Sequence, residues 1–464
     1  MYPIVLLSVL GIVVLFLGFM KSKSVLLPAT LLFLVLALAS NFIDWNQGKV
    51  LYFYEMLAVN NLTLAFNAIV LVSAFMIVAM TRGFQDQEEA QPAEYYGIML
   101  FSLVGAFMII GYEHLIMLFV GIEILSVSMY ILTGSDKSNL RSNEAALKYF
   151  LMGAFATGIM LFGIALLYGA TGSFNLTDIQ SYVSIQGRGV SYILYAGLLL
   201  LLIGMLFKVS AAPFHFWTPD VYDGAPTIFT TFMSTIVKTA GFAAIFRLLS
   251  HSFTPIYSFW WITLAAITVL TLLVGNIIAV YQNSFKRMLA YSSISHAGYL
   301  LIAVTSLSPQ TENAILFYSL AYSIATISAF GVLMLVSKKK ALEGQVDESY
   351  AAFNGLAAQN PLLAFVLAVS MLSLAGIPLT AGFWGKFFVF GSAVERGLVW
   401  MLVVAVLMSA VGIYYYFRAI IAAYLKEGDI GKIRIAPFYR IILVVATAMT
   451  ILFGLAPGIF EKLL

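Results

Sequence analysis

Six ionisable residues inside the long apolar segments of this chain are candidates for proton chemistry. They are one acid, four lysines and one histidine: Glu123, Lys148, Lys208, Lys238, His296 and Lys386. A charge at the centre of a bilayer costs at least ~2.5–3.5 kcal/mol, so a set of this size requires a function or partners. Desolvation disfavours a charged ammonium and a nearby carboxylate favours it, so a lysine whose acidic partner can move can bind and release a proton. The set therefore predicts a proton relay.

Each of these positions also has a simpler structural interpretation. Lys238 lies near the middle of its segment, where snorkelling cannot easily reach water, and its alternative is a structural lysine bonded to carbonyls. Glu123 and Lys208 are candidates for a switchable pair, against a static hydrogen-bonded acid and a snorkelling lysine. Lys386 could lie at the membrane interface. Lys148 is only a few residues into its segment, where anchoring at the interface is the alternative.

His296 lies on an apolar segment with three neighbouring serines. It is either a relay histidine among hydroxyls or an ordinary buried histidine with satisfied hydrogen bonds. In the relay interpretation, Lys208 passes its proton inward to Lys238, and His296 and Lys386 continue the line through bridging waters. Ammonium groups do not coordinate cations and only one buried acid is available, which argues against a dedicated sodium site.

Fourteen apolar segments of the chain are candidates for membrane spans, each of which needs ~20 residues. The chain is 62% hydrophobic and 10% charged, against ~25% charged residues in soluble domains. Segments of this length and uniform apolarity favour helices over barrel strands. The expected ranges are 3–20, 24–40, 60–80, 95–112, 114–133, 144–170, 190–213, 226–249, 258–281, 286–306, 312–336, 360–390, 398–424 and 436–458.

Two of these spans, the seventh and the twelfth, are interrupted at prolines. Pro213 lies in FKVSAAPFHF and Pro378 lies in LAGIPLTAGF. Proline removes a backbone donor and clashes with the preceding turn. In lipid, such a break survives only when it is buried in protein or lines a wet cavity. Paired broken helices at corresponding positions point to a transport site.

The spacing of the ionisable residues predicts an internal repeat. Glu123 and Lys208 are 85 residues apart, and His296 and Lys386 are 90 residues apart. In each pair the first residue lies mid-span and the lysine lies beside a break. This indicates a five-helix unit used twice, in helices 4–8 and 9–13. Because five is odd, the second copy must enter from the opposite face, so the repeats are inverted.

The loops predict an orientation and a domain organisation. Lysine and arginine are far more frequent after odd-numbered spans, so those loops should be cytoplasmic and both termini should face outward. Arg247 and His251 are expected to be interface anchors. The expected domains are an N-terminal three-helix segment (1–94), the two repeats (95–250 and 251–425) and a C-terminal helix (426–464).

The composition excludes several kinds of site. Cysteine is absent, so the chain has no disulfide, no thiolate metal site and no cysteine-ligated iron–sulfur cluster. The net charge of +3 is small and spread over loops, so nucleic acid is not an expected partner.

Several of these segments resemble a known family. FKVSAAPFHFWTPDVYDGAPT, residues 207–227, strongly resembles the seventh-helix motif of the subunit N family of NADH-quinone oxidoreductase, respiratory complex I. The similarity continues in GIEILSVSMYIL around Glu123, EAALKYFLMGA around Lys148, YSSISHAGYLL around His296 and LAGIPLTAGFWGKFFVF around Lys386. It extends from about helix 4 to helix 13, and most of the chain is thereby identified as similar to this antiporter-like membrane subunit.

The resemblance implies a role for each matching residue. Glu123 and Lys208 would be a modulating ion pair, Lys238 the central relay and His296 a connecting residue. Lys386 would be the terminal proton donor and acceptor, and Lys148 resembles a family lysine near Lys208. The resemblance also implies that NADH, FMN, iron–sulfur clusters and quinone are bound by other subunits and not by this chain. The expected partners are sister antiporter-like subunits, small membrane subunits and the lipid of a bacterial inner membrane.

Three functions compete on these observations. The first is a proton-translocating subunit of NADH-quinone oxidoreductase, a translocase in which this chain holds no redox centre. The second is a subunit of an Mrp-type cation/proton antiporter. Such subunits share the lysine and broken-helix pattern but have a different sequence in place of PDVYDGAP. The third is a secondary transporter for an organic solute. That option is disfavoured because the buried polar residues form a row and not a pocket. The first is the function that we expect.

Overall fold

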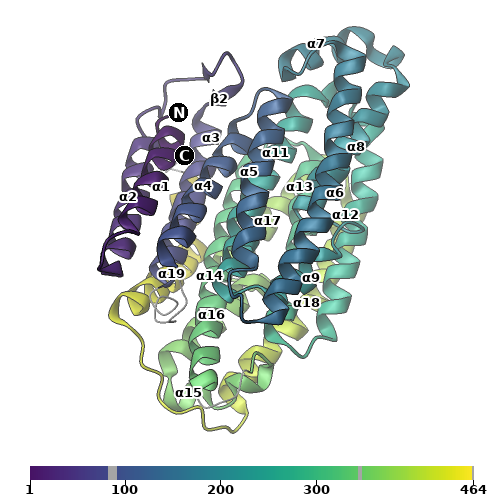
Figure 1. Cartoon of the computed structure of the whole chain (residues 1–464). Coiled ribbons are helices and arrows are strands. Elements are labelled where there is room, and N and C mark those ends of the chain that lie inside the picture. The colour runs from purple at the N-terminus through teal and green to yellow at the C-terminus, as the bar shows by residue number, and fades with distance from the viewer. Residues whose placement is uncertain (82–90, 343–346, 462–464) are drawn as a thin grey trace. The chain divides into compact units, whose positions relative to one another are not determined.

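The computed structural model describes residues 1–81, 91–342 and 347–461, and these residues are almost entirely helical (Figure 1). Eleven helices within these ranges are long and apolar enough to cross a membrane. Three further apolar helices are shorter: α1 (Tyr2–Leu17), α8 (Tyr192–Lys208) and α16 (Pro361–Ala375). The predicted all-α membrane class is confirmed, while the exact number of spans stays a prediction.

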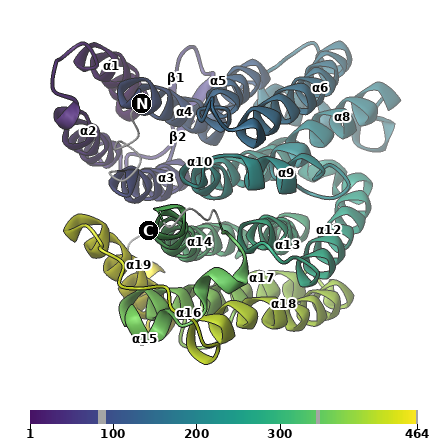
Figure 2. The same cartoon turned by 60° about the horizontal axis from the view of Figure 1, so that its bottom comes forward.

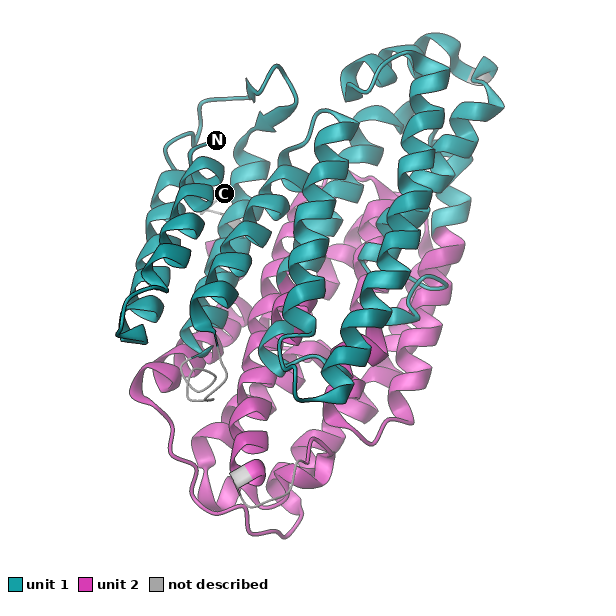
Figure 3. Cartoon of the chain, viewed as in Figure 1, with its two compact units in different colours: residues 1–217, 224–229, 236–264 teal, residues 218–223, 230–235, 265–464 magenta. Residues whose placement is uncertain are grey.

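The chain forms two compact units (Figure 3). Unit 1 comprises residues 1–217, 224–229 and 236–264. Its helices are α1, α2 (Leu26–Asn41), α3 (Asn61–Ala79), α4 (Pro92–Gly111), α5 (Leu115–Thr133), α6 (Leu140–Thr171), α7 (Leu176–Gln186), α8 and α11 (Lys238–Arg247). Between α2 and α3, strands β1 (Val50–Tyr52) and β2 (Leu57–Val59) form an antiparallel hairpin in which Val50 pairs with Val59.

Unit 2 comprises residues 218–223, 230–235 and 265–464. Its helices are α13 (Phe285–Ser306), α14 (Thr311–Leu342), α15 (Leu356–Gln359), α16, α17 (Ala381–Glu395), α18 (Val399–Leu425), α19 (Pro437–Leu455) and α20 (Gly458–Glu461). Helix α12 (Tyr257–Val280) begins in unit 1 and continues into unit 2, and the short helices α9 (Trp217–Gly224) and α10 (Thr227–Phe232) are divided between the units. Within unit 2, α16 packs beside α18, and α14 packs beside α19 (Figure 2).

Polar residues at the helix starts define several of these boundaries. The side chains of Asn60, Asn175, Ser191 and Ser284 each accept a hydrogen bond from a backbone N–H in the first turn of the following helix. Such caps satisfy donors that have no partner within the helix itself. The helices that follow are apolar over most of their surface, as lipid or a protein interior requires.

Small residues allow close helix packing in unit 1, where α6 lies against α8 (Figure 1). A Cβ added to Gly163 would lie 2.5 Å from the backbone nitrogen of Leu201, and one added to Gly197 would lie 3.0 Å from the carbonyl oxygen of Gly163. Glycines at such crossings are typical of membrane helix pairs because the backbones can then approach closely.

Both predicted interruptions are present. Helix α8 ends at Lys208 and the next helix begins at Trp217, while α16 ends at Ala375 and α17 begins at Ala381. These breaks also explain why α8 and α16 are short. The sequence did not predict two other irregularities, the π-helical turns at Met233–Val237 and Leu248–Ser252. A π turn inserts an extra residue into a helix, and such turns are frequent at functional sites.

Candidate functional site

In unit 1, the break after α8 places Lys208 at the last residue of the helix. Its side chain is buried, and its Nζ donates a hydrogen bond to Ser126 Oγ of α5 at 2.7 Å. The same Nζ lies 5.6 Å from the centre of the Tyr149 ring of α6. The partial negative charge at a helix C-terminus favours a cation at this position. The ammonium is therefore held by a hydroxyl, an aromatic face and a helix end.

Glu123 lies on α5, one turn before Ser126 and on the same face of the helix. It is close enough to Lys208 for the two charges to interact electrostatically. Both residues belong to the described part of the chain, where no ion pair within 4.0 Å joins them, and Lys208 Nζ donates to Ser126 Oγ. The Oε1 atom of Glu123 is buried without a hydrogen-bond partner among the described residues. The predicted pair is thus neighbouring but not in direct contact.

Lys148 lies at the margin of this group. Its side chain is 39% exposed on the isolated chain and forms an ion pair of 2.8 Å with Glu144, four residues earlier on α6. The next residue, Tyr149, is fully buried and stacks on Trp217 with ring centres 4.5 Å apart. Helix α6 therefore presents Tyr149, rather than Lys148, to the ammonium of Lys208.

Lys238 is the first residue of α11 and directly follows the π turn at Met233–Val237. Its side chain is 2% exposed, and every residue in the most apolar stretch of its span, Thr227–Ser252, is buried in the protein. A lysine in this environment cannot reach water by snorkelling. This burial agrees with the position expected of a central relay lysine.

A second charged cluster in unit 1 was not predicted. Glu113, between α4 and α5, is 2% exposed, and its Oε1 lies 2.7 Å from Arg247 Nη1 and 3.1 Å from Lys49 Nζ. His251 Nε2 is 3.8 Å from Oε2, and Arg247 Nη2 donates to Thr63 Oγ1 at 2.8 Å. Arg247 is therefore the ion-pair partner of a buried acid and not a free interface anchor. Glu113 follows the end of a span, so from the sequence alone it resembles any loop acid.

In unit 2, His296 of α13 is hydrogen-bonded through both ring nitrogens. Nδ1 lies 2.7 Å from the hydroxyl of Tyr318 on α14, and Nε2 lies 3.0 Å from the hydroxyl of Tyr416 on α18. The Tyr416 hydroxyl is also 2.5 Å from Ser292 Oγ, one turn before His296 on α13. The sequence predicted hydroxyls around this histidine from its neighbouring serines, but the direct partners are tyrosines from other helices.

Lys386 lies on α17, beside the second break. Its Nζ donates to the carbonyl oxygen of Ala375 and to Ser409 Oγ, both at 2.8 Å, and lies 4.7 Å from the centre of the Tyr299 ring. The first residue of the break, Gly376, has a φ of +82°, and a Cβ there would lie 2.7 Å from Lys386 Cδ. Glycine is thus required at this position both for the backbone conformation and for the lysine side chain.

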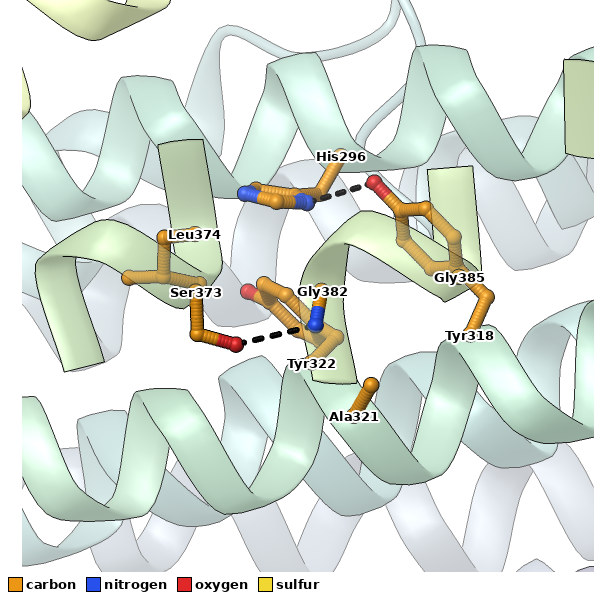
Figure 4. A pocket seen from close by; sticks show the side chains of 8 residues that line it. All are labelled: His296, Tyr318, Ala321, Tyr322, Ser373, Leu374, Gly382 and Gly385. Carbon is orange, nitrogen blue, oxygen red and sulfur yellow. Dashed lines mark hydrogen bonds between the residues drawn. The ribbon is translucent and has the colours of Figure 1, made fainter. Parts of the chain in front are cut away.

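A small cavity lies between His296 and the second break (Figure 4). Its lining includes Tyr322 of α14 and, from the break, Ser373 and Gly382, whose N–H donates to Ser373 Oγ at 3.1 Å. Figure 4 also shows the hydrogen bond between His296 and Tyr318. The cavity is close to the lower limit of size for holding one water molecule.

In each unit, an aromatic ring lies beside the lysine of the break. In unit 1, Glu123, Lys208 and Tyr149 are neighbours. In unit 2, Tyr299 lies between His296, whose ring centre is 6.0 Å away, and the Lys386 ammonium. In the described ranges, no group of three or more His, Cys, Asp and Glu side chains could hold a metal ion. These groups can hold, donate and accept protons.

Comparisons with known proteins match the whole chain. Residues 113–412 match the family described as NADH:quinone oxidoreductase/Mrp antiporter, TM. The chain is 40% identical to NADH-quinone oxidoreductase subunit N of Cytophaga hutchinsonii, with 100% of this chain and 99% of that protein covered.

Two solved structures extend the comparison. A chain of respiratory complex I from Thermus thermophilus is 36% identical, with a TM-score of 0.84 and coverage of 98% of this chain and 97% of that chain. A chain of the Mrp complex from Dietzia sp. has a TM-score of 0.86 over 99% of this chain and 95% of that chain, but is only 19% identical. The Mrp likeness therefore concerns the fold alone.

Proposed function

Since this chain belongs to the subunit N family of NADH-quinone oxidoreductase, we propose that it is a proton-translocating membrane subunit of that translocase. It moves protons across the membrane through a buried Lys/Glu/His relay, coupled to quinone reduction elsewhere in the complex. The proposal rests on a structural feature that the two helix breaks share. Each has a buried lysine, Lys208 or Lys386, whose Nζ donates to a serine hydroxyl. Ammonium and hydroxyl groups in contact can exchange protons without a resident cofactor.

The proposed roles follow the chain of contacts in each unit. Glu123 modulates the charge on Lys208, because the acid acts on the ammonium without binding it directly. Lys238 is the central relay, His296 the connecting residue and Lys386 the terminal donor and acceptor. Lys148 has a supporting role at the margin, where its charge is already paired with Glu144.

We assign fourteen spans, arranged as an N-terminal segment (1–94), two inverted five-helix repeats (95–250 and 251–425) with broken helices 7 and 12, and a C-terminal helix (426–464). The membrane is the bacterial inner membrane, and both termini face outward. The excess of lysine and arginine in loops after odd-numbered spans supports this orientation. Arg82 and Lys462, which contribute to that loop count, lie outside the described residues.

The proposal requires partners. Moving one proton against ~150–200 mV needs about 3.5–4.6 kcal/mol, at ~2.3 kcal/mol per charge per 100 mV. The energy comes from redox chemistry in other subunits, which bind NADH, FMN, iron–sulfur clusters and quinone. The partners in the membrane are sister antiporter-like subunits and small membrane subunits.

An Mrp-type cation/proton antiporter subunit is the second candidate. The matching family includes both kinds of protein, and the Mrp chain shares the fold. The PDVYDGAP stretch and the 40% identity to a subunit N over the full length favour the redox-coupled function.

The test uses membrane vesicles that carry the intact assembly. NADH-dependent quinone reduction and proton uptake are measured for the wild type, Lys208→Ala and Lys238→Ala, with assembly verified in each. Lys137→Ala is the control, since Lys137 is an exposed loop lysine in unit 1. We expect both buried-lysine variants to lose pumping while the control retains it. Normal pumping by both variants, or a wild type without redox turnover, would refute the proposal and favour the antiporter.

A further inference from the structure

We propose that Tyr416 and Ser292 are proton-relay residues, which connect His296 to the end of α13 that begins at Phe285. This inference rests on the proposed function and deepens it, because it assigns the branch by which unit 2 takes up protons. The two hydroxyls are not distinguished from many others in the chain by residue type or by position in the sequence.

The observation is an unbroken line of short hydrogen bonds in unit 2. Ser292 Oγ lies 2.5 Å from the Tyr416 hydroxyl, which lies 3.0 Å from His296 Nε2. On the other side of the ring, Nδ1 lies 2.7 Å from the Tyr318 hydroxyl. All four side chains are buried, with at most 4% of their surface exposed. Three helices, α13, α14 and α18, contribute to this line.

The chemistry of these groups allows a proton to cross the line. A neutral imidazole donates from one nitrogen and accepts at the other, and a hydroxyl both donates and accepts. A proton arriving at Ser292 Oγ releases the Ser292 proton to the Tyr416 oxygen. The Tyr416 proton then moves to Nε2, so the arriving proton is held on His296 as an imidazolium whose Nδ1–H donates to the Tyr318 oxygen. In each transfer one O–H or N–H bond forms as one breaks, and the positive charge ends on His296.

Other tyrosines lie beside His296 and Lys386. The Tyr322 ring of α14 is 4.7 Å from the His296 ring, and the Tyr299 ring lies under the Lys386 ammonium of α17. The hydroxyl of Tyr415, the residue before Tyr416 on α18, donates to Asn276 Oδ1 at 3.0 Å. His296 thus has Lys386 on one side and the Tyr416 branch on the other.

The branch points toward the start of α13. Ser292 lies one turn nearer to that end than His296, and Lys286 in the first turn lies 3.6 Å from Glu348. In the proposed orientation this end of α13 faces the cytoplasm, the side from which protons are taken up. A buried hydroxyl pair between this ion pair and a relay histidine is placed where an uptake branch is needed.

The test compares two variants with a matched control in vesicles that carry the intact assembly. Tyr416→Phe and Ser292→Ala each remove one hydroxyl of the branch. The control is Tyr439→Phe, which removes an equally buried hydroxyl of unit 2 that donates to the Gly331 carbonyl oxygen at 2.8 Å. Proton uptake and quinone reduction are measured in H2O and in D2O, because a rate-limiting proton transfer raises the solvent isotope effect and a packing defect does not.

We expect proton uptake to fall about tenfold in Tyr416→Phe, within the range of single proton-transfer groups, and its isotope effect to rise. Ser292→Ala should change in the same direction, and Tyr439→Phe should behave like the wild type. If Tyr416→Phe does not assemble, Ser292→Ala decides by itself. Normal uptake or an unchanged isotope effect overturns the inference. If Lys208→Ala and Lys238→Ala still abolish pumping in that case, the proposed function survives and only this branch is refuted.

Discussion

Replacing Gly376 with alanine should displace Lys386 and thereby impair proton translocation. Gly376 has a φ of +82°, and an added Cβ would lie 2.7 Å from Cδ, 3.1 Å from Cε and 3.2 Å from Nζ of Lys386. The atoms nearest to the new methyl group belong to a flexible side chain, so the lysine will move before the backbone does. Its Nζ would then leave the carbonyl oxygen of Ala375 and the hydroxyl of Ser409.

The size of this effect follows from two contributions. A left-handed backbone costs an alanine ~1–2 kcal/mol. Losing one hydrogen bond of the charged ammonium costs a further ~1.5–3 kcal/mol, which makes the aligned position of Lys386 about 10–150-fold rarer. Gly397 separates the two contributions, because its φ is +77° and an added Cβ would meet nothing within 4 Å. Gly397→Ala therefore carries the backbone cost alone.

The assay is proton uptake at a known rate of quinone reduction, in vesicles that carry each assembled variant. We expect Gly376→Ala to lose at least about tenfold in uptake, and Gly397→Ala to pump like the wild type. Equal pumping by the two variants would refute the reasoning, because it would mean that the position of Lys386 does not limit proton transfer.

Two further predictions concern stability. Glu113→Gln should destabilise unit 1 by about 3 kcal/mol, since it removes the buried counter-charge of Arg247. As a control, Glu144→Gln in an exposed ion pair should cost under ~1 kcal/mol. The measurement is the dissociation temperature of the solubilised assembly, and equal shifts in the two variants would contradict the prediction. The Gln359 amide and the Gly431 N–H donate hydrogen bonds to the Asp429 carboxylate and hold its pKa below the ordinary value of 3.8. These bonds therefore stabilise the folded loop above pH 3.8, and the stabilisation is lost as the pH falls through the lower pKa of the folded state. Hydrogen exchange of the Gly431 N–H, corrected for the intrinsic exchange rate, should show protection that decreases below about pH 4. Gln359→Leu should weaken this pH dependence. Protection that is constant down to about pH 2 would contradict the prediction.

Much of the architecture could be predicted because it depends on local composition. Uniform apolarity identified the helices, and proline identified both breaks, where Lys208 and Lys386 lie as expected. The ion pair of Lys148 with Glu144 follows from the spacing of four residues on one helix. The hairpin of β1 and β2 and the amphipathic helix α7 lie in connecting segments and were not predicted.

The partners of the ionisable residues could not be predicted in the same way. Glu113 and Arg247 are 134 residues apart, and His296 and Tyr416 are 120 residues apart. A membrane helix that is apolar on every side carries little information about which face meets a neighbour, because lipid and protein interior are equally apolar. The π turn before Lys238 is likewise set by tertiary packing, since no residue type marks it.

The sequence by itself determined the membrane class, the positions of the breaks and the lysines that lie beside them. Hydrophobicity and proline act through the local backbone, so their consequences can be predicted one segment at a time. Only the tertiary structure decided that Lys208 donates its hydrogen bond to Ser126 and not to Glu123. It likewise decided that tyrosine hydroxyls are hydrogen-bonded to both ring nitrogens of His296. Hydrogen-bond partners depend on how distant helices pack, and in this chain that packing brings hydroxyls from other helices to Lys208 and His296.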